Sequence, residues 1–190
     1  GTEVADPYRW LEQGGDPEVE AWVARQNAHT RQALDADPFR RWWHERLVAL
    51  MQLPVVAGAD IVGERLISLE RFAGGEQFVL TGRAIASDAA AEDEPMVLFD
   101  PTSAAADATV AIDWFHPSAD GSLVAVGVSE GGTEDSVLRV LDASSGQDMA
   151  EAIPSTRACS LAWDPDGRGF HYTRSPAGDQ YHRTVHYHRL

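Results

Sequence analysis

One phrase occurs twice in this sequence, and its spacing limits the folds that the chain can adopt. The first copy, FHPSADGSLVAVGV, spans residues 115–128, and the second, WDPDGRGFHYT, spans residues 163–173. Each copy runs from an aromatic residue through a proline and an Asp-Gly turn into an apolar stretch. The Asp-Gly pairs begin at Asp120 and Asp166, which are 46 residues apart. A repeat of about 40–50 residues built from short strands is typical of the blades of a β-propeller.

The chain before the repeat has the signals of helices. Asp16 supplies an N-cap, and Pro17 supplies a proline at the first helical position. The pair Asp37-Pro38 repeats this signal, and an apolar stripe at helical spacing follows it until Pro54. We therefore predict an N-terminal helical segment over residues 1–54.

After Pro54 the pattern changes to short strands separated by turns rich in Gly, Ser and Asp. The segment Leu123–Val128 is continuously apolar, as expected of a strand whose two faces are both covered. The predicted strands are Arg65–Phe72, Gln77–Thr81, Pro95–Phe99, Leu123–Val128, Val137–Leu141, Gly169–Thr173 and Thr184–Leu190. The predicted fold is mainly β with an N-terminal helical segment. It places a partial β-propeller of about two to three blades over residues 55–190, with blades near 57–100 and 110–143 and an incomplete one from about 157.

Composition excludes several classes of partner. The formal net charge of −15 argues against binding to nucleic acid, because the phosphates would be repelled. No apolar run approaches the roughly 20 residues of a membrane span, so no membrane partner is expected. The single cysteine, Cys159, has no partner for an internal disulfide, which fits a reducing compartment and a cytoplasmic protein. We predict that Cys159 is a buried structural residue in a strand.

A G-x-S-x-G motif covers residues 127–131 and centres on Ser129. In α/β-hydrolases this motif holds a nucleophilic serine on a sharp turn between a strand and a helix. Here a strand precedes the motif, but a glycine-rich turn and another strand follow it. Without the helix N-terminus no backbone donor is aimed at an oxyanion, so we predict a hairpin turn at Ser129 rather than a nucleophile.

His182, His186 and His188 share parity in the predicted last strand. Three imidazoles on one face of a strand are a candidate zinc site. The alternative is that they form the polar side of the strand or face a neighbouring strand. We favour the alternative because no carboxylate partner is identifiable. The sequence therefore predicts no catalytic, cofactor-binding or metal-binding residue in this chain.

The motifs together resemble one enzyme family. The opening DPYRWLE at 6–12, followed by AWV at 21–23 and the pair Gln26-Asn27, resembles the N-terminus of prolyl oligopeptidases, the serine peptidase family S9. Residues 98–149 and the stretches 161–163 and 169–172 resemble successive propeller segments of that family. The oligopeptidase B branch has a similar start, but the residues at 22–27 favour the prolyl branch.

The resemblance implies a serine endopeptidase that cleaves short peptides after proline. In that family a seven-bladed propeller gates access to a C-terminal α/β-hydrolase domain, which carries the catalytic triad, and the N-terminal helices pack on that domain. This chain would supply the gate and the helical support, and alone it is expected to be inactive. The alternative is a stand-alone β-propeller-like interaction module without catalysis. In either case the last predicted strand, 184–190, is expected to expose an unpaired edge that favours self-association.

Overall fold

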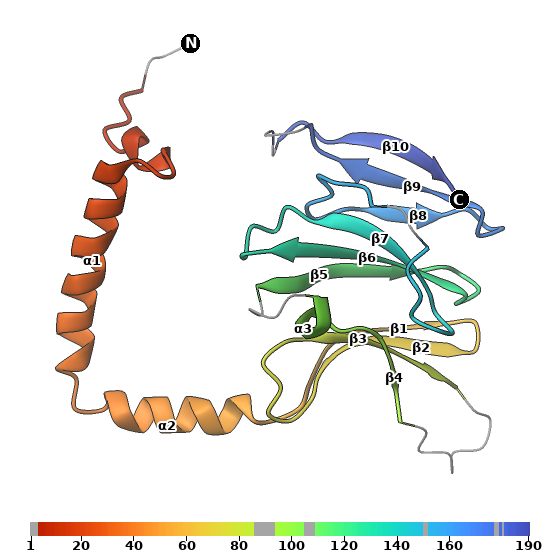
Figure 1. The fold of residues 1–190 in the computed structure, drawn as a ribbon, viewed down its shortest axis with the longest axis horizontal. Helices are drawn as coiled ribbons and strands as arrows, with labels where there is room; N and C mark the ends of the chain where they lie inside the picture. The colour runs from red at the N-terminus through yellow and green to blue at the C-terminus, as the bar shows by residue number, and fades with distance from the viewer. Residues whose placement is uncertain (1–3, 86–93, 105–108, 150–151, 177–178, 180) are drawn as a thin grey trace. The chain divides into compact units, whose positions relative to one another are not determined.

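The computed structural model describes residues 4–85, 94–104, 109–149, 152–176, 179 and 181–190. The chain divides into two compact units, residues 1–51 and residues 52–190. The first unit is helical, and the second consists of antiparallel sheets (Figure 1).

The helical unit contains a short 3-10 helix, η1 (Arg9–Glu12), followed by α1 (Pro17–Asp35) and α2 (Arg40–Met51). The predicted cap is confirmed, because the Asp16 carboxylate accepts the backbone N–H of Glu18 at 2.7 Å. At the second start signal the Asp37 carboxylate likewise accepts the backbone N–H of Phe39 at 2.8 Å. These bonds satisfy amides that the first turn of a helix leaves without partners.

The second unit holds three antiparallel sheets, and each is built from strands that follow one another in the sequence. The first sheet has the order β1-β2-β3-β4, the second β5-β6-β7 and the third β10-β9-β8. A short helix, α3 (Pro101–Ala104), joins the first sheet to the second. The strand bounds are β1 Val55–Val62, β2 Arg65–Arg71, β3 Val79–Ala84, β4 Met96–Phe99, β5 Val110–Pro117, β6 Leu123–Glu130, β7 Val137–Asp142, β8 Leu161–Trp163, β9 Gly169–Arg174 and β10 Thr184–Arg189.

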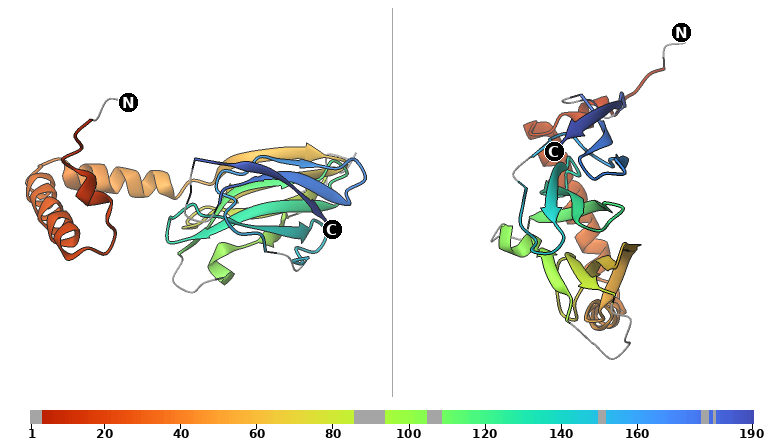
Figure 2. Two further views of the ribbon diagram at one scale, coloured as in Figure 1. Left: turned by 90° about the horizontal axis from the view of Figure 1, so that it is seen from above. Right: turned by 90° about the vertical axis from the view of Figure 1, so that its right-hand side faces the viewer.

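The three sheets overlie one another, as the views of Figures 1 and 2 show. One apolar cluster, which includes Ile67, Leu80 and Val126, fills the space between the first and second sheets. Another, which includes Leu138 and Phe170, lies between the second and third. Short antiparallel sheets stacked face to face in this way are the blades of a propeller, so the predicted fold class is confirmed.

Strand β6 explains the apolar half of the repeated phrase. Val124 and Val126 belong to the cluster shared with the first sheet, and both are fully buried. Gly127, on the opposite face, lies under the indole of Trp114, with no room for a larger side chain. The continuous apolar run is therefore required because both faces of β6 are covered, as predicted.

The Asp-Gly turn of the first copy is held by its own side chains. The Asp120 carboxylate accepts the backbone N–H of Ser122 at 3.0 Å and the hydroxyl of Ser118 at 2.7 Å. Gly121 follows with a φ of 71°, a conformation that glycine adopts without steric cost. These hydrogen bonds, led by that from the Ser122 amide, lower the pKa of Asp120 below its ordinary value.

Candidate functional site

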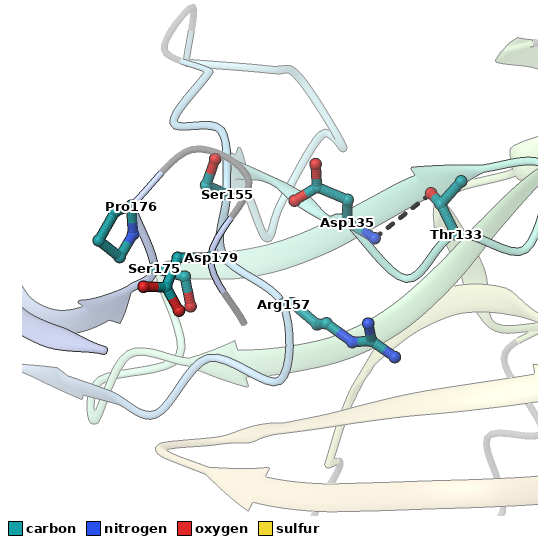
Figure 3. Close-up of a pocket in the computed structure, with 7 residues that line it drawn as sticks. All are labelled: Thr133, Asp135, Ser155, Arg157, Ser175, Pro176 and Asp179. Atoms are coloured by element: carbon teal, nitrogen blue, oxygen red, sulfur yellow. Dashed lines mark hydrogen bonds between the residues drawn. The ribbon is translucent and has the colours of Figure 1, made fainter. Parts of the chain in front are cut away.

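Two hollows lie between the second and third sheets, and Arg157 lines both. The larger, which we call the β5 hollow, has a volume of about 620 Å³. The smaller, which we call the loop hollow, has a volume of about 270 Å³ and is shown in Figure 3. The β5 hollow is lined by Ile112, Asp113, Trp114, His116, Glu134, Arg157, Ala158 and Cys159, and the loop hollow by Thr133, Asp135, Ser155, Arg157, Ser175, Pro176 and Asp179.

The β5 hollow has a rigid wall. Trp114 donates its indole N–H to the carbonyl of Thr156 at 3.1 Å, and Trp163 donates its own to the carbonyl of His116 at 3.0 Å. The ring of His116 contacts the carbonyl oxygen of Cys159 through Nε2 at 3.2 Å. These bonds tie β5 to the segment that leads into the third sheet.

The charged groups of the β5 hollow come from three separate segments. Asp113 occupies a bulge in β5, where the register with β6 shifts between Ile112 and Trp114. The guanidinium of Arg157 donates to the carboxylate of Glu134 at 2.6 Å. The sequence patterns did not predict that Asp113, Glu134 and Arg157 line one hollow. The signal that could have indicated it is the single carboxylate of Asp113 in the otherwise apolar stretch at 110–115.

Ser129 lies inside β6 and not on a turn, so the predicted hairpin turn at this position was wrong. The strand continues to Glu130 because Ser129 and Glu130 still pair with Ala111 and Val110 of β5. The Ser129 side chain is 3% exposed and donates to Oδ1 of Asp113 at 3.1 Å. The turn that follows leads to β7 and not to a helix. That Ser129 is not a nucleophile stays a prediction.

Cys159 is 6% exposed and belongs to the apolar cluster between the second and third sheets, as predicted for a structural cysteine. Its placement in a strand was wrong, because β8 begins at Leu161. Burial is the main cause that raises the pKa of the Cys159 thiol. A buried thiol with a raised pKa is a poor nucleophile at neutral pH.

The three histidines do not converge. His182 precedes β10, and its Nδ1 lies 2.6 Å from the carboxylate of Asp179. His186 and His188 lie on β10 opposite Tyr172 and Phe170, and their rings contact those aromatic rings at 5.5 and 5.2 Å between centroids. Within the described part of the chain, no group of three His, Cys, Asp or Glu residues has the geometry of a metal site.

Strand β10 is exposed on its edge and over most of its side chains. It pairs with β9, and in the described residues no strand pairs with its other edge. Val185 and Tyr187 are 71% and 51% exposed. The Tyr187 hydroxyl donates to the carboxylate of Asp164 at 2.7 Å, and this bond is the main cause that raises the pKa of Tyr187.

The helical unit exposes an apolar surface, which we call the α2 stripe. Trp42 and Trp43 pack edge to face with ring centroids 4.5 Å apart, yet each is 55% exposed. None of the residues in α1 or α2 is buried. None of the described helices is long and apolar enough to cross a membrane. The α2 stripe consists of Phe39, Trp42, Trp43, Leu47, Leu50 and Met51.

The fold and the known proteins similar to this chain indicate the same class of protein. Stacked antiparallel sheets joined in sequence order place the chain among β-propeller proteins. The family model for the prolyl oligopeptidase N-terminal β-propeller domain matches residues 1–190. The chain therefore belongs to the prolyl oligopeptidase family and corresponds to its N-terminal propeller region.

Individual relatives agree with this assignment. A prolyl endopeptidase of Elizabethkingia meningoseptica is 28% identical over 173 residues, which cover 91% of this chain and 24% of that enzyme. The prolyl oligopeptidase A of Amanita bisporigera is 23% identical over 198 residues, which cover 92% of this chain and 25% of that enzyme. The chain thus spans about a quarter of the length of these relatives.

A solved structure from a study of two prolyl endopeptidases superposes with a TM-score of 0.82 at 31% identity, covering 100% of this chain and 28% of the other. Prolyl oligopeptidase B of Galerina marginata, bound to a 35mer substrate, superposes with a TM-score of 0.79 at 24% identity, covering 98% of this chain and 28% of that one. At 24% identity, this second similarity concerns the fold alone.

Proposed function

We propose that this chain is the N-terminal part of a serine endopeptidase that cleaves short peptides after proline. In this proposal its sheets form part of the gate through which peptides reach a catalytic centre elsewhere in the protein. The observation that carries the proposal is the match of the propeller-domain model to all of residues 1–190, in a chain that covers only 24% of a prolyl endopeptidase relative.

The test compares the 190-residue chain with the longer protein encoded by the open reading frame around it. We expect a proline-specific chromogenic peptide to be hydrolysed by the longer protein and not by the 190-residue chain. Turnover by the pure 190-residue chain would refute the proposal. A stop codon directly after Leu190 would do so as well, and would favour a stand-alone interaction module instead.

We also propose that the α2 stripe packs on an α/β-hydrolase domain of the longer protein. Support comes from the exposure of Phe39, Trp42 and Trp43, at 65%, 55% and 55%, because a contiguous apolar patch with two tryptophans marks an interaction surface. In the longer protein, Trp43→Ala should lower the melting temperature. The neighbouring Arg41→Ala should change it little, because Arg41 lies outside the α2 stripe and its exposed ion pair with Glu45, at 2.8 Å, contributes little to stability. Equal effects of the two substitutions would contradict this packing.

For the isolated chain we propose self-association through the edge of β10 with which no strand pairs in the part of the chain that the structure describes. An exposed strand edge with apolar side chains such as Val185 and Tyr187 is a template for pairing with a second chain. Light scattering should give a mass that rises with concentration, and Val185→Lys should suppress the rise, because a charge on an edge strand opposes pairing. A constant monomer mass over a wide concentration range would contradict the proposal.

The location of the protein is a further proposal. A single buried thiol fits a reducing compartment, so we propose the cytoplasm. Recovery of the protein in the membrane or secreted fraction on cell fractionation would contradict this.

A further inference from the structure

We propose that the β5 hollow is a binding site for the cationic group of a peptide, with the Asp113 carboxylate as its anion. The inference rests on the proposed function, because it assigns a charge preference to the gate through which peptides pass. The observations that carry it are the position of β5, the way the Asp113 carboxylate is held, and the charge balance of the hollow.

Strand β5 lies where the first strands of the three sheets meet. A methyl group on Gly58 of β1 would come within 3.3 Å of the Phe115 ring of β5. The indole N–H of Trp163 of β8 donates to the carbonyl of His116 of β5 at 3.0 Å. In a propeller the blades surround a central channel. We place β5 beside that channel because it contacts the first strand of each neighbouring sheet. A peptide that passes along these strands therefore meets the β5 hollow.

Two buried serines hold the Asp113 carboxylate, while Asp113 itself is exposed to solvent. Its Oδ1 accepts the hydroxyl of Ser129 at 3.1 Å, and its Oδ2 accepts the hydroxyl of Ser136 at 2.6 Å. Those serines are 3% and 0% exposed, whereas Asp113 itself is exposed. Each carboxylate oxygen accepts more than one hydrogen bond, so both keep capacity for a ligand. Two buried donors hold the anion in a single orientation without neutralising its charge.

Among the described residues, the Asp113 carboxylate of the hollow has no ion-pair partner. Glu134 is paired with Arg157 at 2.6 Å, and these two charges cancel. The indole of Trp114 forms part of the adjacent wall, and an aromatic ring beside a carboxylate favours a cation over a neutral ligand.

The size of the hollow agrees with a peptide ligand. Its volume of about 620 Å³ is within the range of sites that bind small molecules and short peptide segments. The ligand chemistry that fits is an ammonium or guanidinium group with apolar neighbours. A lysine or arginine side chain supplies such a group, and so does a free peptide amino terminus.

The test is an NMR titration of the 190-residue chain that follows the indole N–H resonance of Trp114. Three peptides serve as probes: acetyl-Ala-Lys-Ala-Pro-Ala-amide, the same peptide with Glu in place of Lys, and Ala-Ala-Ala-Pro-Ala-amide with a free amino terminus. We expect a saturable shift with the acetylated lysine peptide and none at the same concentrations with the glutamate peptide. The Asp113→Asn substitution should weaken the lysine complex about fivefold, as expected for loss of a partly exposed ion pair.

Asp148→Asn is the matched control. It removes the same charge from a residue that pairs with Arg139 and does not line the hollow. If both substitutions weaken binding equally, the effect is the net charge of the chain and the proposal is wrong. Equal shifts with the lysine and glutamate peptides, or no shift with either, would also overturn it.

Two further outcomes sharpen the result. A shift with the free amino terminus as well as with lysine identifies the ammonium group as the feature recognised, and a shift with lysine alone assigns it to the side chain. If Asp113→Asn does not fold, the salt dependence of peptide binding by the native chain tests the proposal. Raising the salt concentration from about 0.05 M to about 0.5 M must weaken a complex held by charge. Binding that is independent of salt would refute the proposal. These outcomes leave the peptidase assay with its proline substrate unaffected, so the two proposals fail independently.

Discussion

The contact between Gly127 and Trp114 gives the sharpest stability prediction. In β6 the α-carbon of Gly127 faces the Trp114 indole so closely that an added methyl group would overlap the ring atoms. Trp114 must therefore move in Gly127→Ala. That movement breaks the indole hydrogen bond to the carbonyl of Thr156, which is 3.1 Å long.

The magnitude follows from these two effects. Overpacking of a well-filled core by one methyl group costs about 1–3 kcal/mol. Loss of one hydrogen bond adds about 0.5–1.5 kcal/mol. We expect Gly127→Ala to lower the free energy of unfolding by about 2–4 kcal/mol, which in a domain of this size lowers the melting temperature by about 5–15 °C.

The assay is urea unfolding of four proteins: the native chain, Gly127→Ala, Trp114→Ala and the double variant. Trp114→Ala is itself destabilising, but it empties the space that the new methyl group needs. In that background Gly127→Ala should cost less than about 1 kcal/mol, and the difference between backgrounds measures the coupling of the two residues. Gly14→Ala serves as a control, because nothing lies within 4 Å of the added carbon. An equal cost of Gly127→Ala in both backgrounds would show that the overlap with Trp114 is not the cause.

Three further predictions concern the same unit. Leu138→Ala should lower the free energy of unfolding by about 2–5 kcal/mol in chemical denaturation, because Leu138 is fully buried between two sheets; an effect below about 1 kcal/mol would contradict this. The pKa of Asp120 is lowered in the folded state. Its contribution to the free energy of unfolding is therefore complete above its unfolded pKa of about 4 and is lost as the pH falls through the folded pKa. The stability difference between the native chain and Asp120→Asn should therefore shrink on acidification. A difference that grows would contradict a lowered pKa of Asp120 in the folded state. Cys159 should react slowly with a thiol reagent in the native chain and rapidly in urea, because its thiol is buried and its pKa raised; equal rates would contradict its burial.

Local signals made the clearest parts of the fold predictable. Asp16 and Pro17 define the start of α1 through a cap that involves only neighbouring residues. The short apolar run that begins at Leu123, bounded by turn residues, indicates a strand covered on both faces, and Val124–Ser129 of β6 are buried. Signals of this kind depend on a few adjacent positions.

Features that depend on contacts between one strand and another were not predictable from local patterns. The sequence patterns gave no strand at Val55–Val62, where most side chains are exposed and β1 is formed by its ladder with β2. In β5 the bulge beside Asp113 interrupts the alternation that marks a strand. The serine partners of Asp113 are 16 and 23 positions away in the chain, and only the register of the sheet and the loop after β6 bring them to its carboxylate.

The order of the strands within each sheet has a consequence for how the protein is made. In the described residues each sheet pairs consecutive strands only, so its hydrogen bonds can form without a distant part of the chain. Such short-range pairing lowers the contact order, which speeds folding and allows sheets to form in sequence as the chain leaves the ribosome. Each sheet is then also a unit of duplication, because copying its gene segment adds a whole layer without cutting a ladder. The doubled Asp-Gly phrase is what such a duplication would leave behind.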